Sequence, residues 1–117
     1  MQVSEITFAT ATPIDGYGPG FFRVADQVLD GPICMTETKS QPWGGYKDTS
    51  TLLALKDDID FLLVGTGPDM THVPATFRTE LEEAGIGIEH MATPSACRTF
   101  NVLMAEGRRV AAALIPV

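Results

Sequence analysis

The chain has 117 residues, the usual size of one domain, and we expect residues 1–117 to form a single domain. Hydrophobic residues make up 44% and charged residues 20%, which is typical of globular proteins and argues against disorder. Fifteen acids against eight bases give a net charge of −7, and no basic stripe offsets it, so nucleic acid is excluded as an expected partner.

The ends of the chain and its cysteines predict a compartment. The longest apolar run, residues 110–117, is far shorter than the roughly 18 residues that cross a bilayer. The first ten residues contain an acid and no base, unlike a signal peptide. Cys34 and Cys97 are too few for a disulfide framework. We therefore expect a cytoplasmic protein that does not insert directly into a membrane.

The N-terminal part of the sequence predicts short strands. A weak alternation of apolar and polar residues over 3–8 indicates a strand, and the glycines and prolines of 13–20 predict a loop. Two apolar stretches, 21–24 and 27–29, are separated by two residues, Ala25 and Asp26, and predict a β-hairpin.

A loop and a helix cap are predicted next. After a short strand at 33–35, the polar stretch 36–41 and the Pro-Trp-Gly-Gly sequence 42–45 predict one continuous loop, because neither proline nor paired glycine suits the interior of an element. Further along, Thr93 is predicted to cap a helix whose first position is Pro94.

From residue 50 onward the pattern alternates between helix and strand. Apolar stripes at helical spacing predict three helices, at 50–56, 73–84 and 94–106. The continuous apolar run 61–64 predicts a strand covered on both faces, and further strands are expected at 86–91 and 109–115. Such alternation indicates βαβ units, so the predicted fold class is α/β with a β-rich N-terminal portion, and spacing alone favours an all-parallel core.

Three stretches resemble a known family of small proteins: Phe61–Gly67, Met91–Leu103 and Glu106–Leu114, with Pro42-Trp43 upstream of them. The family includes mitochondrial complex I assembly factor 3 and the adipogenesis-associated protein of similar size, while most bacterial and archaeal members have no assigned function. The resemblance covers nearly the whole chain. It implies a three-layer α/β fold with a mixed central sheet and a bacterial cytosolic member, and it supplies no catalytic residues.

Gly65, Thr66 and Gly67 follow a predicted strand and precede a helix, where a phosphate-binding loop would lie. The third glycine of the dinucleotide fingerprint is missing, and no Lys-Ser or Lys-Thr pair completes a Walker loop. Two interpretations stay open, a tight strand-to-helix turn and an anion-binding loop.

Arg98 and Asn101 are polar residues of the third predicted helix, three positions apart, and can point into one cleft. One hypothesis places them beside Gly65–Gly67 as a shallow site for a carboxylate or phosphate. The other makes them part of a structural hydrogen-bond cluster that ties the helix to adjacent loops.

Trp43 has two interpretations, an anchor for a protein partner and a cover for the open edge of the sheet. Cys97 is predicted to be a buried core residue and not a nucleophile. The isolated cysteines and histidines lack the paired spacing of zinc ligands, so we expect no metal site, and no cofactor is expected.

Two functions fit these features. The first is a non-enzymatic interaction or assembly factor with an unidentified protein partner, related to a respiratory complex by the family resemblance. The second is a protein or enzyme that binds a small anionic ligand through Gly65–Gly67, Arg98 and Asn101. The sequence leaves open whether any reaction is catalysed, and the missing catalytic set favours the first function.

Overall fold

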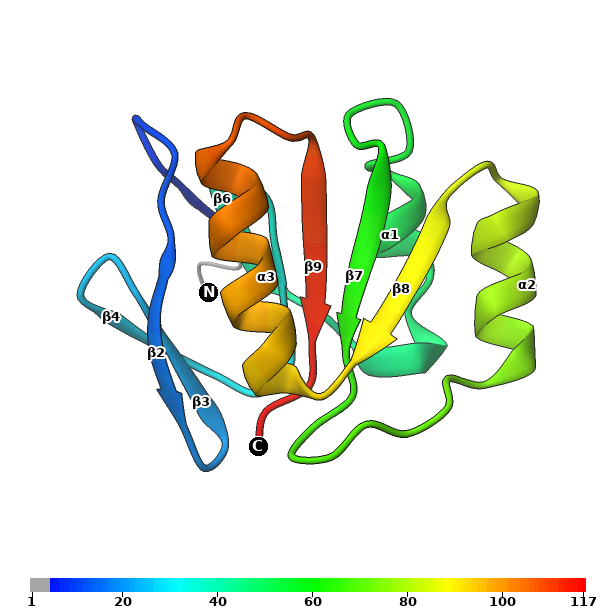
Figure 1. Cartoon of the computed structure of the whole chain (residues 1–117), viewed down its shortest axis with the longest axis horizontal. Helices are drawn as coiled ribbons and strands as arrows, with labels where there is room; N and C mark the ends of the chain where they lie inside the picture. Colours follow the sequence, from blue (N-terminus) through cyan, green and yellow to red (C-terminus); the bar gives the residue numbers. More distant parts are fainter. Residues whose placement is uncertain (1–4) are drawn as a thin grey trace.

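The computed structural model describes residues 5–117. Its helices are the 3-10 helix η1 (Gly45–Lys47), α1 (Ser50–Leu53), α2 (Ala75–Glu83) and α3 (Thr93–Ala105) (Figure 1). Its strands are β1 (Ile6–Thr7), β2 (Ile14–Gly18), β3 (Phe21–Val24), β4 (Gln27–Asp30), β5 (Ile33–Met35), β6 (Lys39–Pro42), β7 (Phe61–Gly65), β8 (Gly87–Met91) and β9 (Val110–Leu114).

The main sheet has six strands in the order β1-β6-β5-β9-β7-β8. Strand β7 lies parallel to both β9 and β8, whereas β5 runs antiparallel to β9 and to β6. The sheet is therefore mixed, as the family resemblance implies, and the all-parallel core that spacing favours is wrong. Helical crossovers give parallel neighbours, but β5 and β6 are joined by a short link that forces an antiparallel pair.

The predicted hairpin is confirmed as β3 and β4 within a second, three-stranded sheet in the order β2-β3-β4. Its turn residues Ala25 and Asp26 have φ values of 51° and 64°, as a two-residue hairpin turn requires. The predicted loop at 13–20 is wrong, because β2 occupies most of it. The ring of Phe21 packs directly against Gly18, where a Cβ would lie 2.5 Å away, so a glycine here makes room for an aromatic neighbour.

The predicted loop at 36–45 is also corrected, because residues 39–42 form β6 between β5 and β1. Neighbouring strands on both sides supply its hydrogen bonds, and these outweigh the polar composition of the segment. Pro42 is the last residue of β6. At this position the N–H that proline lacks does not break a hydrogen bond in the middle of the strand.

The remaining elements match the predictions closely. Helices α2 and α3 fall within a residue or two of the predicted bounds, whereas α1 ends early at Leu53 because the next bonds, such as Leu55 N–H to the Leu52 carbonyl, span three residues. Only Ile6 and Thr7 of the predicted strand 3–8 are in β1, and residues 3 and 4 lie outside the described residues. Within residues 5–117, no helix is both long and apolar enough to cross a membrane.

Two hydrophobic clusters lie on opposite faces of the main sheet. One joins α3 and the three-stranded sheet to the face that carries Leu63, Val110 and Leu114. The other joins α1 and α2 to the face that carries Leu62 and Val64. In Figure 1, α3 lies in front of the sheet and α1 behind it. Strand β7 is thus covered on both faces, as predicted, and the molecule has three layers.

Candidate functional site

The Gly65–Gly67 segment leaves the carboxyl end of β7, between β9 and β8. Thr66 is buried, and its N–H donates to the Met91 carbonyl at 2.9 Å. Its hydroxyl donates to the Asp69 carbonyl at 2.7 Å and accepts the Thr71 N–H at 3.1 Å. The side chain of Thr66 therefore stabilises the loop that follows β7.

Thr93 closes this turn from the other side. Its hydroxyl oxygen accepts the Gly67 N–H at 2.8 Å and its O–H donates to the Ile115 carbonyl at 2.6 Å, while the Thr93 N–H donates to the Gly67 carbonyl at 2.8 Å. Thr93 is completely buried. The predicted cap is therefore wrong: Ala92 is the N-cap of α3, without a side-chain cap bond, and the Thr93 hydroxyl joins the ends of β7 and β9.

Gly65 makes room for this contact. A Cβ at this position would lie 2.7 Å from the Thr93 hydroxyl oxygen and 2.9 Å from a methyl carbon of Leu114, so any side chain here would collide with its neighbours. Gly67 has a φ of 107°, a conformation that favours glycine. Both glycines thus serve the close approach of helix and strand, which agrees with the interpretation as a tight turn.

Asn101 connects α3 to β2. Its side-chain oxygen accepts the Ile14 N–H at 2.8 Å, and its side-chain N–H donates to the Ile14 carbonyl at 2.9 Å. The amide therefore satisfies both backbone groups of one residue, as a neighbouring strand would. This contact holds the three-stranded sheet against α3, in line with the structural interpretation.

Arg98 is exposed beside a groove of about 190 Å³ between β2 and α3. The groove is lined by Ile14, Asp15, Gly16, Tyr17, Pro94, Cys97, Arg98 and Asn101. Among residues 5–117, no carboxylate pairs with Arg98. The structure brings Arg98 and Asn101 together at one groove, but the Gly65–Gly67 turn does not line it.

Trp43 is only 2% exposed and packs against Tyr46 and Phe77, at ring-centroid distances of 5.9 and 6.1 Å. Its indole N–H donates to the Asp48 carbonyl at 2.8 Å. Burial tends to raise the pKa of the Asp48 carboxyl, but hydrogen bonds from the Gly44 N–H and from Thr51 hold that pKa below its usual value. A partner could reach the indole only if these neighbours moved apart, and its role as an anchor stays a prediction.

Both cysteines are buried, which confirms the predicted burial of Cys97, while its lack of a nucleophilic role stays a prediction. Burial raises the pKa of the Cys34 thiol to about 12 and that of the Cys97 thiol to about 12, and in the second case the nearby Arg98 opposes the rise. A raised pKa and burial both oppose formation of a thiolate, so we expect both thiols to react slowly in the folded protein.

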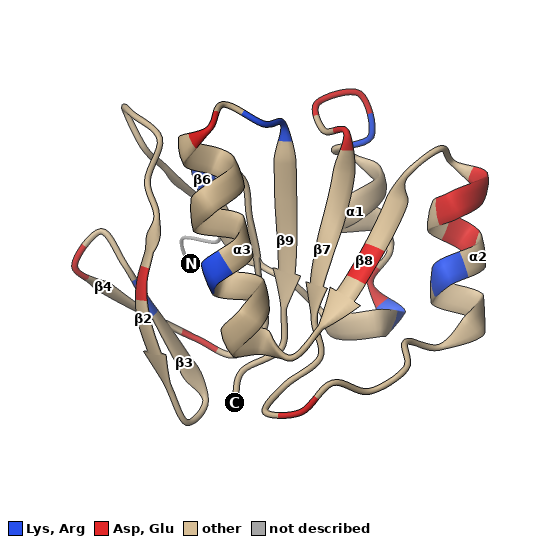
Figure 2. Cartoon of the chain, in the orientation of Figure 1, with Lys and Arg blue, Asp and Glu red and all other residues tan. Residues whose placement is uncertain are grey.

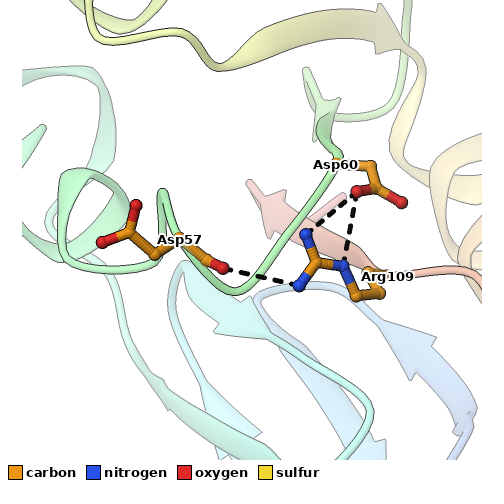
Figure 3. A network of polar contacts seen from close by, with 3 residues as sticks. All are labelled: Asp57, Asp60 and Arg109. Atoms are coloured by element: carbon orange, nitrogen blue, oxygen red, sulfur yellow. Dashed lines mark hydrogen bonds and ion pairs between the residues drawn. The ribbon is translucent and has the colours of Figure 1, made fainter.

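The sequence does not predict one polar network, which joins Arg109 to Asp57 and Asp60. The Arg109 guanidinium donates to the Asp60 carboxylate at 3.1 and 3.3 Å and to the Asp57 carbonyl at 3.4 Å (Figure 3). These acids precede Arg109 by some 50 positions, and only the parallel pairing of β7 with β9 brings them together. In the part of the chain that the structure describes, no three His, Cys, Asp or Glu side chains are placed to hold a metal ion.

These features define a three-layer α/β protein whose polar residues mainly fasten one element to another. The model of the family described as "Protein of unknown function (DUF498/DUF598)" matches residues 14–115. The chain therefore belongs to this family, which confirms the resemblance seen in the sequence.

Relatives with curated names fall into two groups. An uncharacterised protein of Rhodobacter capsulatus is 48% identical over 117 residues, which cover 100% of this chain and 94% of that protein. NADH dehydrogenase [ubiquinone] 1 alpha subcomplex assembly factor 3 of Danio rerio is 34% identical over 99% of this chain and 71% of its own length. The Homo sapiens protein of the same name is 32% identical over 92% of this chain and 62% of its own length.

Solved structures share the fold. A protein of Bartonella henselae, described as an outer membrane protein, is 40% identical and superposes with a TM-score of 0.83 over 94% of this chain and 98% of its own. A Rhodopseudomonas palustris protein is 31% identical, with a TM-score of 0.80 over 100% of this chain and 90% of its own. A Bordetella pertussis protein described as an Mth938-like domain is 27% identical, with a TM-score of 0.74 over 99% of this chain and 92% of its own.

Proposed function

We propose that this chain is a non-enzymatic protein-binding factor that acts in the assembly of an NADH dehydrogenase. One observation carries the proposal: relatives named as assembly factors of that enzyme align with almost the whole chain, 99% of it in Danio rerio at 34% identity. The aligned region includes the elements that form both cores, so the relatives share the surface-bearing scaffold and not a short motif.

Several polar groups that could bind a ligand already have hydrogen-bond partners within the protein, and this supports the proposed function. The Gly67 N–H, which an anion would need, is held by Thr93, and the amide of Asn101 is held by Ile14. Both thiols are buried with raised pKa values, so neither is a ready nucleophile. These polar groups therefore stabilise the fold, and we place the function at the protein surface.

The experiment is affinity purification of the tagged chain from its source organism, followed by mass spectrometry and by native electrophoresis of the bound material. We expect subunits of the NADH dehydrogenase to co-purify in an assembly intermediate that lacks part of the mature enzyme. Recovery of the tagged chain without any of those subunits would contradict the proposal.

We further propose that residues 1–117 act as one domain in the cytoplasm. A solvated assembly factor would meet newly made subunits there before they join a membrane complex. The Bartonella henselae relative, however, is described as an outer membrane protein. Cell fractionation decides between the two: recovery of the chain in the outer-membrane fraction would refute a cytoplasmic location.

A second candidate function is the binding of a small anion at the groove beside Arg98. The observation in its favour is that this guanidinium is exposed at a groove and has no carboxylate partner in residues 5–117. Because the Gly65–Gly67 turn lies outside the groove lining, the anion would bind Arg98 without it. Calorimetric titration with inorganic phosphate and with acetate tests this, and binding that persists in Arg98→Met would exclude the site.

A further inference from the structure

A groove lies between η1 and the first turns of α2, away from the site beside Arg98. Its volume is about 560 Å³, within the range of sites that bind small molecules or single side chains. We call it the α2 groove, and its lining includes Tyr46, Lys47, Thr49, Pro74, Phe77 and Glu80. Aromatic rings, a proline and a carboxylate therefore meet at one hollow of the surface.

The aromatic part of the α2 groove is fixed by packing beneath it. The rings of Tyr46 and Phe77 meet edge to face, with centroids 5.1 Å apart, and the buried Trp43 packs against both. Phe77 is buried as well, whereas Tyr46 is half-buried. The Tyr46 hydroxyl is buried, so the exposed part of this residue that a ligand can contact excludes the hydroxyl. The packed cluster holds the Tyr46 ring in place before any ligand arrives.

The carboxylate of the α2 groove is also held in place. The Thr49 hydroxyl, on the η1 side, donates to Oε2 of Glu80 at 2.6 Å. Oε1 of Glu80 accepts no hydrogen bond and the carboxylate makes no ion pair within residues 5–117. Glu80 is exposed, so its free oxygen can accept a donor from outside the protein.

A second, smaller groove extends the negative surface along α2. Its volume is about 310 Å³, and it adjoins the α2 groove because Thr76 and Glu80 line both. Glu83 also lines it, one turn further along the helix. A ligand seated against Glu80 therefore has a second carboxylate nearby on the same helix.

The charges of α2 favour a cation at this position. The helix carries three glutamates and one base, Arg78, and Figure 2 shows its charged positions as mainly acidic. Arg78 pairs with Glu82 at 3.1 Å, so that pair is already neutral. Lys47, in the groove lining, is exposed and makes no ion pair with Glu80 among the described residues. The two grooves together therefore present two glutamates against one lysine.

We infer that the α2 groove binds an arginine side chain of a protein partner. The inference rests on the proposed function for the source of that arginine. A guanidinium has a flat face that stacks on an aromatic ring such as Tyr46, and N–H groups at its edge that donate to a carboxylate such as Glu80. A lysine ammonium would pair with the carboxylate but has no flat face for the ring. A second copy of this chain would bring another net charge of −7 towards these glutamates.

A titration followed by NMR on the isotope-labelled chain tests the groove directly. The probe is N-acetyl-arginine amide, and its control is N-acetyl-citrulline amide, which has the same shape without the positive charge. We expect the arginine probe to shift the amide signals of residues 46–49 and 74–80 with a roughly millimolar Kd, as suits a single side chain. The citrulline probe should bind about fivefold more weakly, because it cannot form an ion pair. Equal binding of the two probes, or no shift at these residues, would overturn the inference.

Matched variants locate the charge that the probe meets. Glu80→Gln removes the negative charge and keeps an oxygen for the Thr49 hydroxyl, and its control is Glu82→Gln, on the same helix but outside both groove linings. We expect Glu80→Gln to weaken binding of the arginine probe about fivefold and the control to stay within about twofold of the wild type. Tyr46→Phe keeps the ring and should bind as the wild type does. Equal affinities of the two glutamine variants would contradict the inference.

The co-purification described above connects the groove to the partner. Glu80→Gln should recover roughly fivefold less NADH dehydrogenase subunit than Glu82→Gln, with the same melting temperature in both. Equal recovery would overturn the groove as the docking site and leave the proposed function standing. Failure of the wild type to recover any subunit would remove the proposed function, and with it the protein source of the arginine, even where the probe binds. A wild-type dimer in analytical ultracentrifugation that Glu80→Gln converts to a monomer would show a second copy as the occupant, and would overturn the inference.

Discussion

A Cβ on Gly65 would lie 2.7 Å from the hydroxyl oxygen of Thr93, closer than side-chain atoms approach in folded proteins. Gly65→Ala should therefore destabilise the protein by about 2 kcal/mol, because both the Thr93 hydroxyl and the Leu114 side chain would have to move in a packed core. Urea denaturation measures this. The control is Gly16→Ala, where a Cβ would meet nothing within 4 Å, and an equal loss in both variants would contradict the account.

The paired bonds between Asn101 and Ile14 predict a local effect of mutation. In Asn101→Asp, a carboxylate would face the Ile14 carbonyl in place of an N–H donor, and we expect a loss of about 1–3 kcal/mol. Hydrogen exchange should accelerate in β2–β4 before it accelerates in β7. Arg98→Met, one turn away and exposed, should change stability by less than about 0.5 kcal/mol. A larger loss in the arginine variant would make Arg98 a structural residue.

The buried thiols predict slow labelling. With the pKa values of Cys34 and Cys97 raised to about 12 by burial, a thiol reagent at pH 8 should modify the folded protein only as fast as the protein unfolds. Both cysteines should react at once in concentrated guanidinium chloride. Rapid modification of either thiol in the native protein, detected by intact mass, would show that its site is open.

Tyr46 has a buried hydroxyl without a hydrogen-bond partner within residues 5–117, and burial raises its pKa. Tyr46→Phe removes this polar atom and keeps the edge contact with the Phe77 ring, whose centroid lies 5.1 Å away. Stability should stay the same or rise by about 1 kcal/mol, since an unpaired buried hydroxyl is costly. A clear fall in the melting temperature of this variant would mean that the hydroxyl makes a contact the structure does not contain.

The sequence predicted the elements of the second half well, because its apolar stripes and runs have unambiguous periods. It did not predict β2 and β6, since their glycines and polar residues are held in strands by neighbouring strands and by the Phe21 ring. Local sequence carries no record of such neighbours.

At the candidate site, the sequence predicts two of the groove residues, Arg98 and Asn101, but neither the β2 side of the groove nor the hydrogen-bond partners. Threonine before proline is a common helix start signal and predicts a cap at Thr93. Its hydroxyl instead bonds Gly67 and Ile115, which lie 26 and 22 positions away. Asn101 likewise bonds a residue 87 positions away.

The most direct test of the central claim is the amount of assembled NADH dehydrogenase in cells that lack this chain, measured by in-gel activity after native electrophoresis. The account predicts less assembled enzyme and an accumulated intermediate, with restoration when the wild-type chain is supplied again. Normal assembly of the enzyme in the absence of the chain would contradict it.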